Sequence, residues 1–506
     1  MGNANLYSLL EERFLGAGEA IAFRPVPGEP LSYLGLCAQV ARYANALEAE
    51  GVAPGDRVTV QIEKSLDNVF LYLATLKVGA VYQPLNTAYT AAEVDYFISD
   101  AKPSLVVCDP SRAESLKPIA AQHGVKAVHT MAPSGEGSLQ DLAANQSAEH
   151  TTAQRAPDDL AGLLYTSGTT GRSKGAMITH DNLSSNALAL HRIWHFQPGD
   201  VLLHALPIFH VHGLYVALNT AFLNQSEIIW LQKFDANQVL SLLPEATVMM
   251  GVPTFYTRLL QAPAFNAEAC RNIRLFVSGS APMLAETHVE FEGRTGQRIL
   301  ERYGMTEAGM ITSNPYDGER RAGTVGYALP DVSVRIAAED GTVLGPGEIG
   351  VLEAKGPNIF AGYWQMPEKT AEEFRPDGYF ITGDMAQMEP DGRVTIVGRS
   401  KDLIISGGFN VYPKEVETEL DDMPGVGESA VIGVPHPDFG EGVVAVITAQ
   451  EGQAPEEADI ISALSQRLAK FKVPKRVFQH AELPRNAMGK VQKAELRAQY
   501  GEIFKA

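Results

Sequence analysis

The sequence contains few cysteines, no apolar run as long as a membrane span, and fewer basic than acidic residues. The three cysteines, Cys37, Cys108 and Cys270, have no paired spacing, which argues against a disulfide or zinc framework and for a reducing compartment. The first residues carry no basic segment ahead of an apolar run, so we expect a cytoplasmic protein that does not bind membranes. The formal net charge of −19 argues against nucleic acid as a partner, although a local cationic pocket can still bind an anionic ligand.

The length and the order of the apolar patterns predict an α/β fold with two domains. The 506 residues exceed what one core usually supports. Apolar strands alternate with helical periodicity on both sides of residue 165, as expected of parallel sheets covered by helices, and short strands rich in Gly, Pro and Asp follow at Val325–Val397. Beyond Gly398–Lys401 the chain has an α+β pattern of its own. We therefore expect a large N-terminal domain of layered α/β subdomains plus a β-rich region, residues 1–398, and a small α+β C-terminal domain, residues 399–506.

A glycine-rich segment, Tyr165–Gly175, follows the apolar run Leu160–Leu164 and has the composition of a phosphate-binding loop. Its three glycines let backbone N–H groups approach phosphate oxygens, and its five Ser and Thr hydroxyls, with Arg172 and Lys174, suit a polyanion. The composition also fits a flexible surface turn, but the two cations between the glycines favour the phosphate loop. It is not the loop of P-loop nucleoside triphosphatases, because that loop has Ser or Thr after its lysine and here Gly175 follows Lys174.

The eleven residues of this segment resemble the signature loop of the acyl-adenylate-forming enzymes, which include acyl-CoA synthetases, luciferases and the adenylation domains of peptide synthetases. Further segments match as well, so the resemblance extends from Tyr165 to Lys490. It implies that the protein uses ATP, Mg²⁺ and coenzyme A. It also implies that Thr170 lies near the metal. The residues of the loop implied to contact ATP are Thr166, Ser167, Gly168, Thr169, Thr170, Gly171, Arg172, Ser173 and Lys174.

The segment Glu301–Glu307, read Glu-Arg-Tyr-Gly-Met-Thr-Glu, joins an aromatic face, a hydroxyl and a carboxylate within seven residues. Such a set suits a base, a phosphate and a Mg²⁺ ion. The alternative is an ordinary helix start capped by Thr306. The resemblance implies that Tyr303 stacks on adenine, Thr306 contacts the α-phosphate and Glu307 holds Mg²⁺. It also implies that the ATP site includes Glu301, Arg302 and Gly304.

Three other residues or segments resemble nucleotide contacts of the same superfamily. Asp384 ends an apolar strand and has two oxygens that can accept both ribose hydroxyls, and an Asx turn is the alternative. Arg399 is expected to reach the ribose or a phosphate, although it also fits a plain charged linker. Ser278–Pro282 permits close backbone approach and resembles the adenine-side loop, or else is a plain strand-to-helix turn. The resemblance predicts ATP contacts for Ser280, Ala281 and Pro282.

The C-terminal part of the chain resembles the mobile cap of these enzymes. Lys401 is expected to be the hinge, and Gly407 and Gly408 are expected to line the coenzyme A tunnel, although a charged linker and a glycine turn explain the spacing equally well. Lys490 resembles the catalytic lysine, whereas an arbitrary lysine near a terminus is usually only solvated. The resemblance implies that the cap swings between adenylation, which uses Lys490, and thioester formation. Lys490 also resembles lysines that acetyltransferases and deacetylases modify in related synthetases.

The acid substrate is indicated by Arg258, on a predicted helix that in this superfamily walls the acyl pocket. A guanidinium there would pair with a second carboxylate, assisted by His210 and Ser278, and His210 is also expected to serve in catalysis. This predicts a small dicarboxylic acid. The segments Ile208–Gly213 and Glu301–Glu307 resemble those of malonyl-CoA synthetases. The alternative is that Arg258 is a surface arginine.

The predicted activity is therefore that of an AMP-forming acid–thiol ligase. It would convert malonate or methylmalonate to the CoA thioester through an acyl-adenylate, with release of pyrophosphate. A ligase for another small or aryl acid, a peptide-synthetase adenylation domain, a luciferase-like oxygenase and a nucleotide-binding regulator without catalysis remain alternatives. A metal site at His210 and His212 is disfavoured, because no third ligand is evident nearby.

Overall fold

Two mainly parallel sheets form the centre of the protein in the computed structural model, which describes residues 2–166, 173–406, 409–450, 455–468 and 470–504. The first sheet has six strands in the order β6-β5-β3-β4-β7-β8 and is parallel except for the hairpin β7-β8. Its strands are β3 (Arg57–Gln61), β4 (Val81–Pro84), β5 (Leu105–Cys108), β6 (Ala127–Thr130), β7 (Leu160–Thr166) and β8 (Lys174–Thr179). β5 and the first five residues of β7 are continuous apolar runs, and β4 and β5 are buried along their whole length, as expected where helices cover both faces of a parallel sheet.

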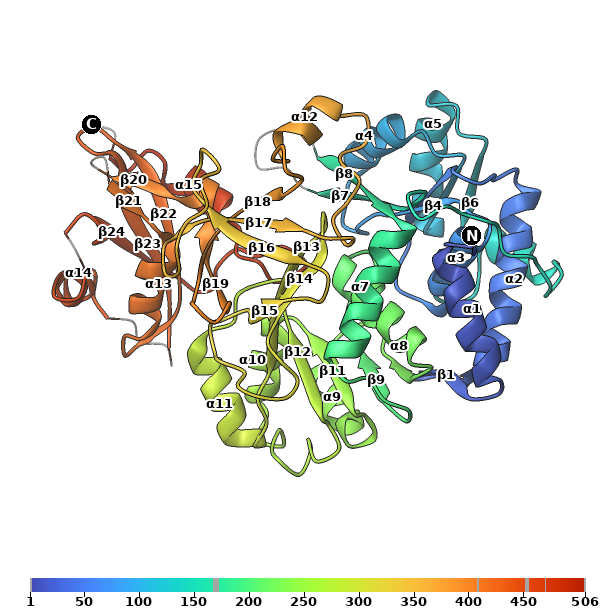
Figure 1. The fold of residues 1–506 in the computed structure, drawn as a ribbon, viewed down its shortest axis with the longest axis horizontal. Coiled ribbons are helices and arrows are strands. Elements are labelled where there is room, and N and C mark those ends of the chain that lie inside the picture. Colours follow the sequence, from blue (N-terminus) through green and yellow to red (C-terminus); the bar gives the residue numbers. More distant parts are fainter. Residues whose placement is uncertain (1, 167–172, 407–408, 451–454, 469, 505–506) are drawn as a thin grey trace.

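The second sheet has nine strands in the order β15-β14-β13-β12-β11-β9-β10-β1-β2. Its central strands are parallel, and antiparallel strands lie at both edges. The strands are β1 (Ile21–Pro25), β2 (Leu31–Ser32), β9 (Val201–His204), β10 (Glu227–Trp230), β11 (Val248–Gly251), β12 (Leu275–Ser278), β13 (Leu300–Met305), β14 (Gly309–Ser313) and β15 (Tyr327–Ala328). Figure 1 shows helices α1, α3, α7 and α8 between the two sheets.

Side-chain caps begin several of the covering helices. Ser32 caps α2, Ser65 caps α3, and Thr90 and Thr179 form capping boxes at α4 and α7. The helices of this part are α1 (Leu6–Ala17), α2 (Tyr33–Ala49), α3 (Leu66–Lys77), α4 (Ala91–Ala101), α5 (Ala113–Gln122), α6 (Ser138–Ala144), α7 (His180–Ile193), α8 (Asn219–Leu223), α9 (Ala236–Leu242), α10 (Pro253–Leu260), α11 (Ala285–Thr295) and α12 (Pro367–Glu372). No helix in the described part of the chain is long and apolar enough to cross a lipid bilayer.

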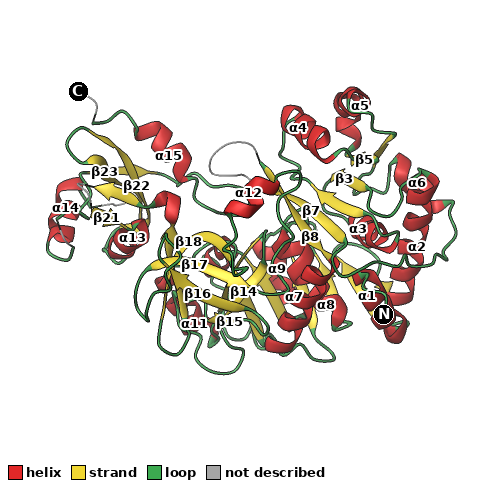
Figure 2. Ribbon diagram, turned by 45° about the horizontal axis from the view of Figure 1, so that its top comes forward, coloured by secondary structure: helices red, strands yellow, loops and turns green. Residues whose placement is uncertain are grey.

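Two antiparallel regions complete the fold. A four-stranded sheet consists of β16 (Ser333–Ala337), β17 (Gly350–Lys355), β18 (Phe380–Met388) and β19 (Val394–Arg399). A five-stranded sheet, seen with its helices at one end of the molecule in Figures 1 and 2, consists of β20 (Ile404–Ser406), β21 (Phe409–Val411), β22 (Val426–His436), β23 (Gly440–Ala449) and β24 (Arg476–His480). Its helices are α13 (Pro413–Asp421), α14 (Glu457–Ser465) and α15 (Lys493–Tyr500).

The α/β class, the layered body and the antiparallel region are confirmed, with two local differences. The apolar pattern of the sequence predicts a helix near residues 214–223, and the structure has a π-helix at His212–Leu218 that continues as α8. The pattern also predicts a helix over residues 460–470, whereas α14 ends at Ser465 and gives way to turns such as the one closed by Leu468 N–H and Leu464 O. From Ile404 onward, the buried hydrophobic residues other than Met488 form two clusters separate from the main core, while the domain boundary at 398/399 stays a prediction.

Candidate active site

A cluster of predicted nucleotide residues lies where β13, β18 and β19 approach one another. The Tyr303 hydroxyl donates to Asp384 Oδ2 at 2.5 Å, and Arg399 Nε lies 2.8 Å from Asp384 Oδ1. Asp384 and Arg399 are neighbours because they are paired residues of the antiparallel strands β18 and β19. Burial, and then the Asp384 carboxylate, raise the pKa of Tyr303, and Asp384 raises the pKa of Arg399. The structure therefore brings together the residues predicted for adenine and ribose.

Glu307, the predicted metal ligand, is buried beside the start of the phosphate loop. Its Oε1 accepts hydrogen bonds from Thr166 Oγ1 and the Tyr363 hydroxyl, both at 3.2 Å. Burial raises the pKa of Glu307. A carboxylate here fits Mg²⁺, which uses one or two protein carboxylates and otherwise takes phosphate oxygens and water. In the described ranges no group of three or more His, Cys, Asp or Glu side chains is placed to hold a metal ion, so substrate oxygens would have to complete the shell.

The end of the phosphate loop contacts Tyr363, which also donates a hydrogen bond to Glu307. Lys174 Nζ lies 4.2 Å from the centre of the Tyr363 ring and 3.5 Å from a carboxylate oxygen of Glu373. Tyr96 donates its hydroxyl hydrogen to Ser173 O at 2.6 Å. The predicted ATP contacts at Ser167, Gly168, Thr169, Thr170, Gly171 and Arg172 lie outside the described residues.

Lys490 approaches the charged residues of this cluster from a tight turn of the C-terminal segment. The Asn486 side chain organises the turn, because its Oδ1 accepts from the backbone N–H groups of Met488 and Lys490 at 2.9 and 3.0 Å. Met488 packs into the main core, and a Cβ on Gly489 would lie 3.2 Å from Thr254 Oγ1 of α10. Desolvation and then Arg399 lower the pKa of Lys490, whereas the carboxylates of Asp384 and Glu307 act in the opposite direction. The charges around Lys490 are therefore those of the predicted ATP site.

A second cluster, at the carboxyl end of β12 and the start of β13, contains a buried cation with no ion-pair partner among the described residues. Arg302 is 4% exposed, and its Nε and Nη2 have no hydrogen-bond partner among the described residues. A Cβ on Gly279 would lie 2.4 Å from Arg302 Cζ, so the guanidinium fills the space that a side chain would need. Burial lowers the pKa of Arg302. A buried unpaired charge is costly, which makes this a place for an anionic ligand.

Polar groups next to Arg302 are also unsatisfied. Ser278 Oγ and His212 Nε2 are buried and lack partners among the described residues, and His212 Nδ1 lies 3.3 Å from Ser280 Oγ. The backbone N–H of His212 donates to His210 Nδ1 at 3.2 Å. Burial, and then Lys490 and Arg302, lower the pKa of His210 to about 3, so its imidazole is neutral at physiological pH. Arg302, Ser278 and His212 together offer hydrogen-bond donors to a carboxylate.

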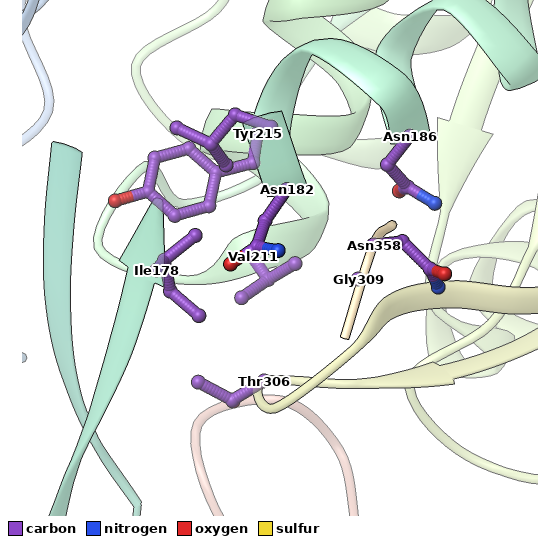
Figure 3. A pocket seen from close by; sticks show the side chains of 9 residues that line it. Ile178, Asn182, Asn186, Val211, Tyr215, Thr306, Gly309 and Asn358 are labelled. Carbon is purple, nitrogen blue, oxygen red and sulfur yellow. The ribbon is translucent and has the colours of Figure 1, made fainter. Parts of the chain in front are cut away.

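Thr306 lines a small cavity between α7 and β14. Figure 3 shows Thr306 facing Ile178, Val211 and Asn182 across it, with Asn186 and Asn358 at one side. The side-chain amides of Asn182 and Asn186 form hydrogen bonds with backbone groups. Asn358 Oδ1 is buried and unpaired among the described residues. The cavity therefore has a polar wall behind the residue predicted to contact the α-phosphate.

Comparison with known proteins assigns this arrangement to a family. The AMP-binding enzyme family matches residues 10–364, and the AMP-binding enzyme C-terminal domain matches residues 415–490. The chain belongs to the AMP-binding enzymes. A malonate–CoA ligase of Arabidopsis thaliana is 36% identical over 483 residues, which cover 89% of this chain and 79% of that protein. The crystal structure of ATP-bound MatB from Rhodopseudomonas palustris is 55% identical with a TM-score of 0.98, and apo MatB from the same organism is 55% identical with a TM-score of 0.86; both comparisons cover 100% of each chain.

In this AMP-binding enzyme Arg258 is exposed, one helical turn after Thr254 on α10. Residues four apart share a helix face, so Arg258 lies on the side of α10 where the Lys490 turn docks. No described residue forms a hydrogen bond or ion pair with it. The contact of Arg258 with the acid stays a prediction. The buried cation is instead Arg302, which the sequence analysis placed in the ATP site. The sequence carries a signal for this separation of Arg302 from the ATP residues. Side chains alternate between the two faces of a strand, so Arg302 points away from the face that carries Glu301 and Tyr303.

The remaining predicted residues are placed as follows. The Glu301 carboxylate accepts from Gly323 N at 3.2 Å, and burial raises its pKa to about 8. Lys401 is exposed in the short 3₁₀ turn Ser400–Asp402, and Asp402 pairs with Arg497 of α15 at 2.6 Å. The predicted nucleotide or tunnel roles of Gly304, Ala281, Pro282, Gly407 and Gly408 stay predictions, and the last two lie outside the described residues.

Proposed function

We propose that the protein is an AMP-forming malonate–CoA ligase. Malonate and ATP give malonyl-AMP and pyrophosphate, and the thiol of coenzyme A then displaces AMP to give malonyl-CoA. One observation supports a dicarboxylic acid above all, namely the buried Arg302 guanidinium, which has no anionic partner in the part of the chain that the structure describes. Its relatives named malonate–CoA ligase support the same substrate, and its likeness to ATP-bound MatB supports the use of ATP.

The distal carboxylate of malonate would bind at Arg302, Ser278 and His212. A charged acceptor satisfies their free donors together, and a charge-assisted contact of this kind contributes about 1.5–3 kcal/mol. A monocarboxylic acid of similar length would leave Arg302 buried and unpaired. Arg258 would add positive charge at the rim of the pocket, since it lies on the helix face next to the Lys490 turn.

The first step requires the proximal carboxylate to attack the α-phosphorus in line with the departing pyrophosphate. Thr306 would orient the α-phosphate, and Lys490 would balance the negative charge that develops on the phosphate oxygens. His210 Nδ1 accepts from the His212 backbone N–H, so neutral His210 carries its hydrogen on Nε2 and would donate it in a hydrogen bond to the reacting carboxylate. Glu307 would hold Mg²⁺, which supplies electrostatic neutralisation of the triphosphate when bound.

The second step would use a different position of the C-terminal domain, residues 399–506. The difference in TM-score between ATP-bound and apo MatB supports such a movement, because the same sequence matches this chain at 0.98 in one state and 0.86 in the other. Lys401 would be the pivot. The segment with Gly407 and Gly408 would then replace Lys490 and guide the thiol of coenzyme A to the acyl-adenylate.

The test is a panel of acids in an assay of thioester formation that depends on ATP and coenzyme A. Malonate and then methylmalonate are expected to give the highest kcat/KM, ahead of acetate, octanoate and coumarate. Activity confined to monocarboxylic acids would refute the dicarboxylate assignment. Failure to release pyrophosphate with every acid would refute the ligase itself and favour a nucleotide-binding regulator.

We also propose that an acetyltransferase and a deacetylase control the enzyme at Lys490. Its side chain is solvent-accessible and lies on a surface turn, and acetylation would remove the charge needed for adenylation. Complete acetylation should abolish pyrophosphate release and deacetylation should restore it; an unchanged rate would rule out this control. The cytoplasm, with its reducing conditions, fits the free thiols of Cys37, Cys108 and Cys270, and cell fractionation would test this location.

A further inference from the structure

Lys64 is a buried lysine that the proposed reaction does not use. It lies between β3 and α3 and is 6% exposed. Its Nζ lies 2.9 Å from His204 Nδ1, 3.1 Å from His204 O and 2.6 Å from Leu231 O, and 4.1 Å from the centre of the Trp230 ring. Within the described ranges no carboxylate forms an ion pair with it. Lys64 therefore connects the six-stranded sheet to the ends of β9 and β10 in the other sheet.

The contacts of His204 define its protonation state. His204 Nε2 lies 2.9 Å from Gly213 O, and a carbonyl oxygen can only accept, so Nε2 carries the hydrogen and Nδ1 accepts from Lys64. Burial, and then Lys64, lower the pKa of His204, which keeps the imidazole neutral. The three groups around Nζ are thus all acceptors. Burial lowers the pKa of Lys64, while these acceptors and the Trp230 face favour its ammonium form.

The Lys64–His204 contact is made at the base of the segment that carries His210 and His212. This segment leaves β9 after His204 and folds back tightly, since a Cβ on Gly213 would lie 2.1 Å from Pro207 O. The bond from His204 to Gly213 O closes the segment at its far end. Its other side, at Ile208 and Phe209, borders a cavity that Lys64 also lines. The hydrogen bond from His204 to Gly213 O therefore ties the two ends of the segment together.

We propose that Lys64 is a positioning residue for acid binding. It fixes the His204 tautomer, and His204 in turn holds the segment that places His210 and His212 beside Arg302. The inference rests on the proposed function of that pocket. It predicts that loss of the Lys64 contact impairs use of the acid more than use of ATP, because the ATP residues lie on other elements.

The experiment compares Lys64→Met and His204→Asn in steady-state pyrophosphate release. The asparagine amide can still offer an acceptor near Lys64 but does not reach Gly213 O, so both variants interrupt the same chain of contacts. We expect kcat/KM for malonate to fall at least ~10-fold in each, mainly through KM for malonate, with KM for ATP within about twofold. The double variant should be no worse than the more impaired single variant, because residues acting in series are not additive.

Lys77→Met is the matched control, since Lys77 is equally buried but pairs with Glu11 away from the site. It is expected to lower the Tm without changing KM for malonate. The inference is overturned if Lys64→Met behaves like this control, or if the losses of the two single variants multiply. Should Lys64→Met fail to fold, an unchanged KM for malonate in His204→Asn overturns it. A wild-type enzyme inactive on malonate refutes the proposed function instead, and the same comparison is then made with the acid it does use.

Discussion

Gly279 and Arg302 are in such close contact that a Cβ on Gly279 would lie 2.4 Å from Arg302 Cζ. Gly279 follows β12, whose end pairs in parallel with the start of β13. A methyl group on Gly279 must displace the guanidinium from the acid pocket. We expect Gly279→Ala to raise KM for malonate about 10-fold, because part of one charge-assisted contact is lost. KM for ATP should stay within about twofold of the wild-type value.

The control for this substitution is Gly293→Ala on the exposed side of α11, where no atom lies within 4 Å of the added Cβ. Alanine is the better helix former, so this variant should be stabilised by about 0.5–1 kcal/mol with unchanged kinetics. An unaltered KM for malonate in Gly279→Ala would show that the guanidinium does not contact the acid.

Arg302→Met should separate binding from stability. The variant loses the contact with the distal carboxylate, so kcat/KM for malonate should fall about 10- to 100-fold. Its Tm should not fall, because an apolar side chain of similar length replaces a buried charge that has no counterion. Steady-state kinetics and thermal denaturation of the same preparation measure both. A large loss of stability with normal kinetics would mean that Arg302 is structural.

Arg258→Ala tests the exposed arginine of α10 separately. If Arg258 contacts the acid at the pocket rim, kcat/KM for malonate should fall, by up to about 1.5–3 kcal/mol for a charge-assisted contact. The exposed Arg271, paired with Glu268, provides the control, and Arg271→Ala should change nothing. Equal kinetics for the two variants would remove Arg258 from the site.

The layered α/β body was predictable because buried parallel strands are continuous apolar runs and covering helices repeat every 3.6 residues. The helix near residues 214–223 was predictable too, but its π form at His212–Leu218 was not, because the hydrophobic pattern does not distinguish π from α hydrogen bonding. The convergence of Tyr303 and Asp384 depends on contact between strands of two different sheets, far apart in sequence, which the resemblance supplied and local pattern did not. The unpaired state of Arg302 is a property of the folded interior, so no spacing of residues could reveal it.

Glu301 makes stability depend on pH. Burial raises its pKa to about 8 in the folded protein, against the ordinary 4.5. Because the pKa of this carboxyl is raised, the folded state holds a proton that the unfolded state releases. The favourable contribution of Glu301 to the free energy of unfolding is therefore present below pH 4.5 and is lost as pH rises through 8. Glu301→Gln cannot ionise, and its Tm should exceed that of the wild type by more at pH 9 than at pH 5. The same Tm difference at both values would contradict the assignment.

Asp384→Asn should weaken ATP binding. The amide keeps the shape but loses the charge that pairs with Arg399 and offers one acceptor where the carboxylate offers two. KM for ATP should rise about 10- to 100-fold, corresponding to about 1.5–3 kcal/mol, with little change in KM for malonate. Asp391→Asn, at an exposed turn of the same sheet, is the control. If KM for malonate rises and KM for ATP does not, Asp384 is not a nucleotide residue.

Lys490→Ala should divide the two half-reactions. Lys490 lies among Arg399, Asp384 and Glu307, where its charge can act on the triphosphate, so adenylation should fall by several orders of magnitude, measured as pyrophosphate released in a single turnover. The proposed movement of the C-terminal domain takes Lys490 away before the thiol attacks. Thioester formation from preformed malonyl-AMP and coenzyme A should therefore proceed at the wild-type rate. Lys493→Ala, a nearby lysine that pairs with Glu417 within the C-terminal region, should affect neither half-reaction. Equal impairment of both half-reactions in Lys490→Ala would mean that the lysine stays at the site throughout the cycle, and the two-position scheme would have to be abandoned.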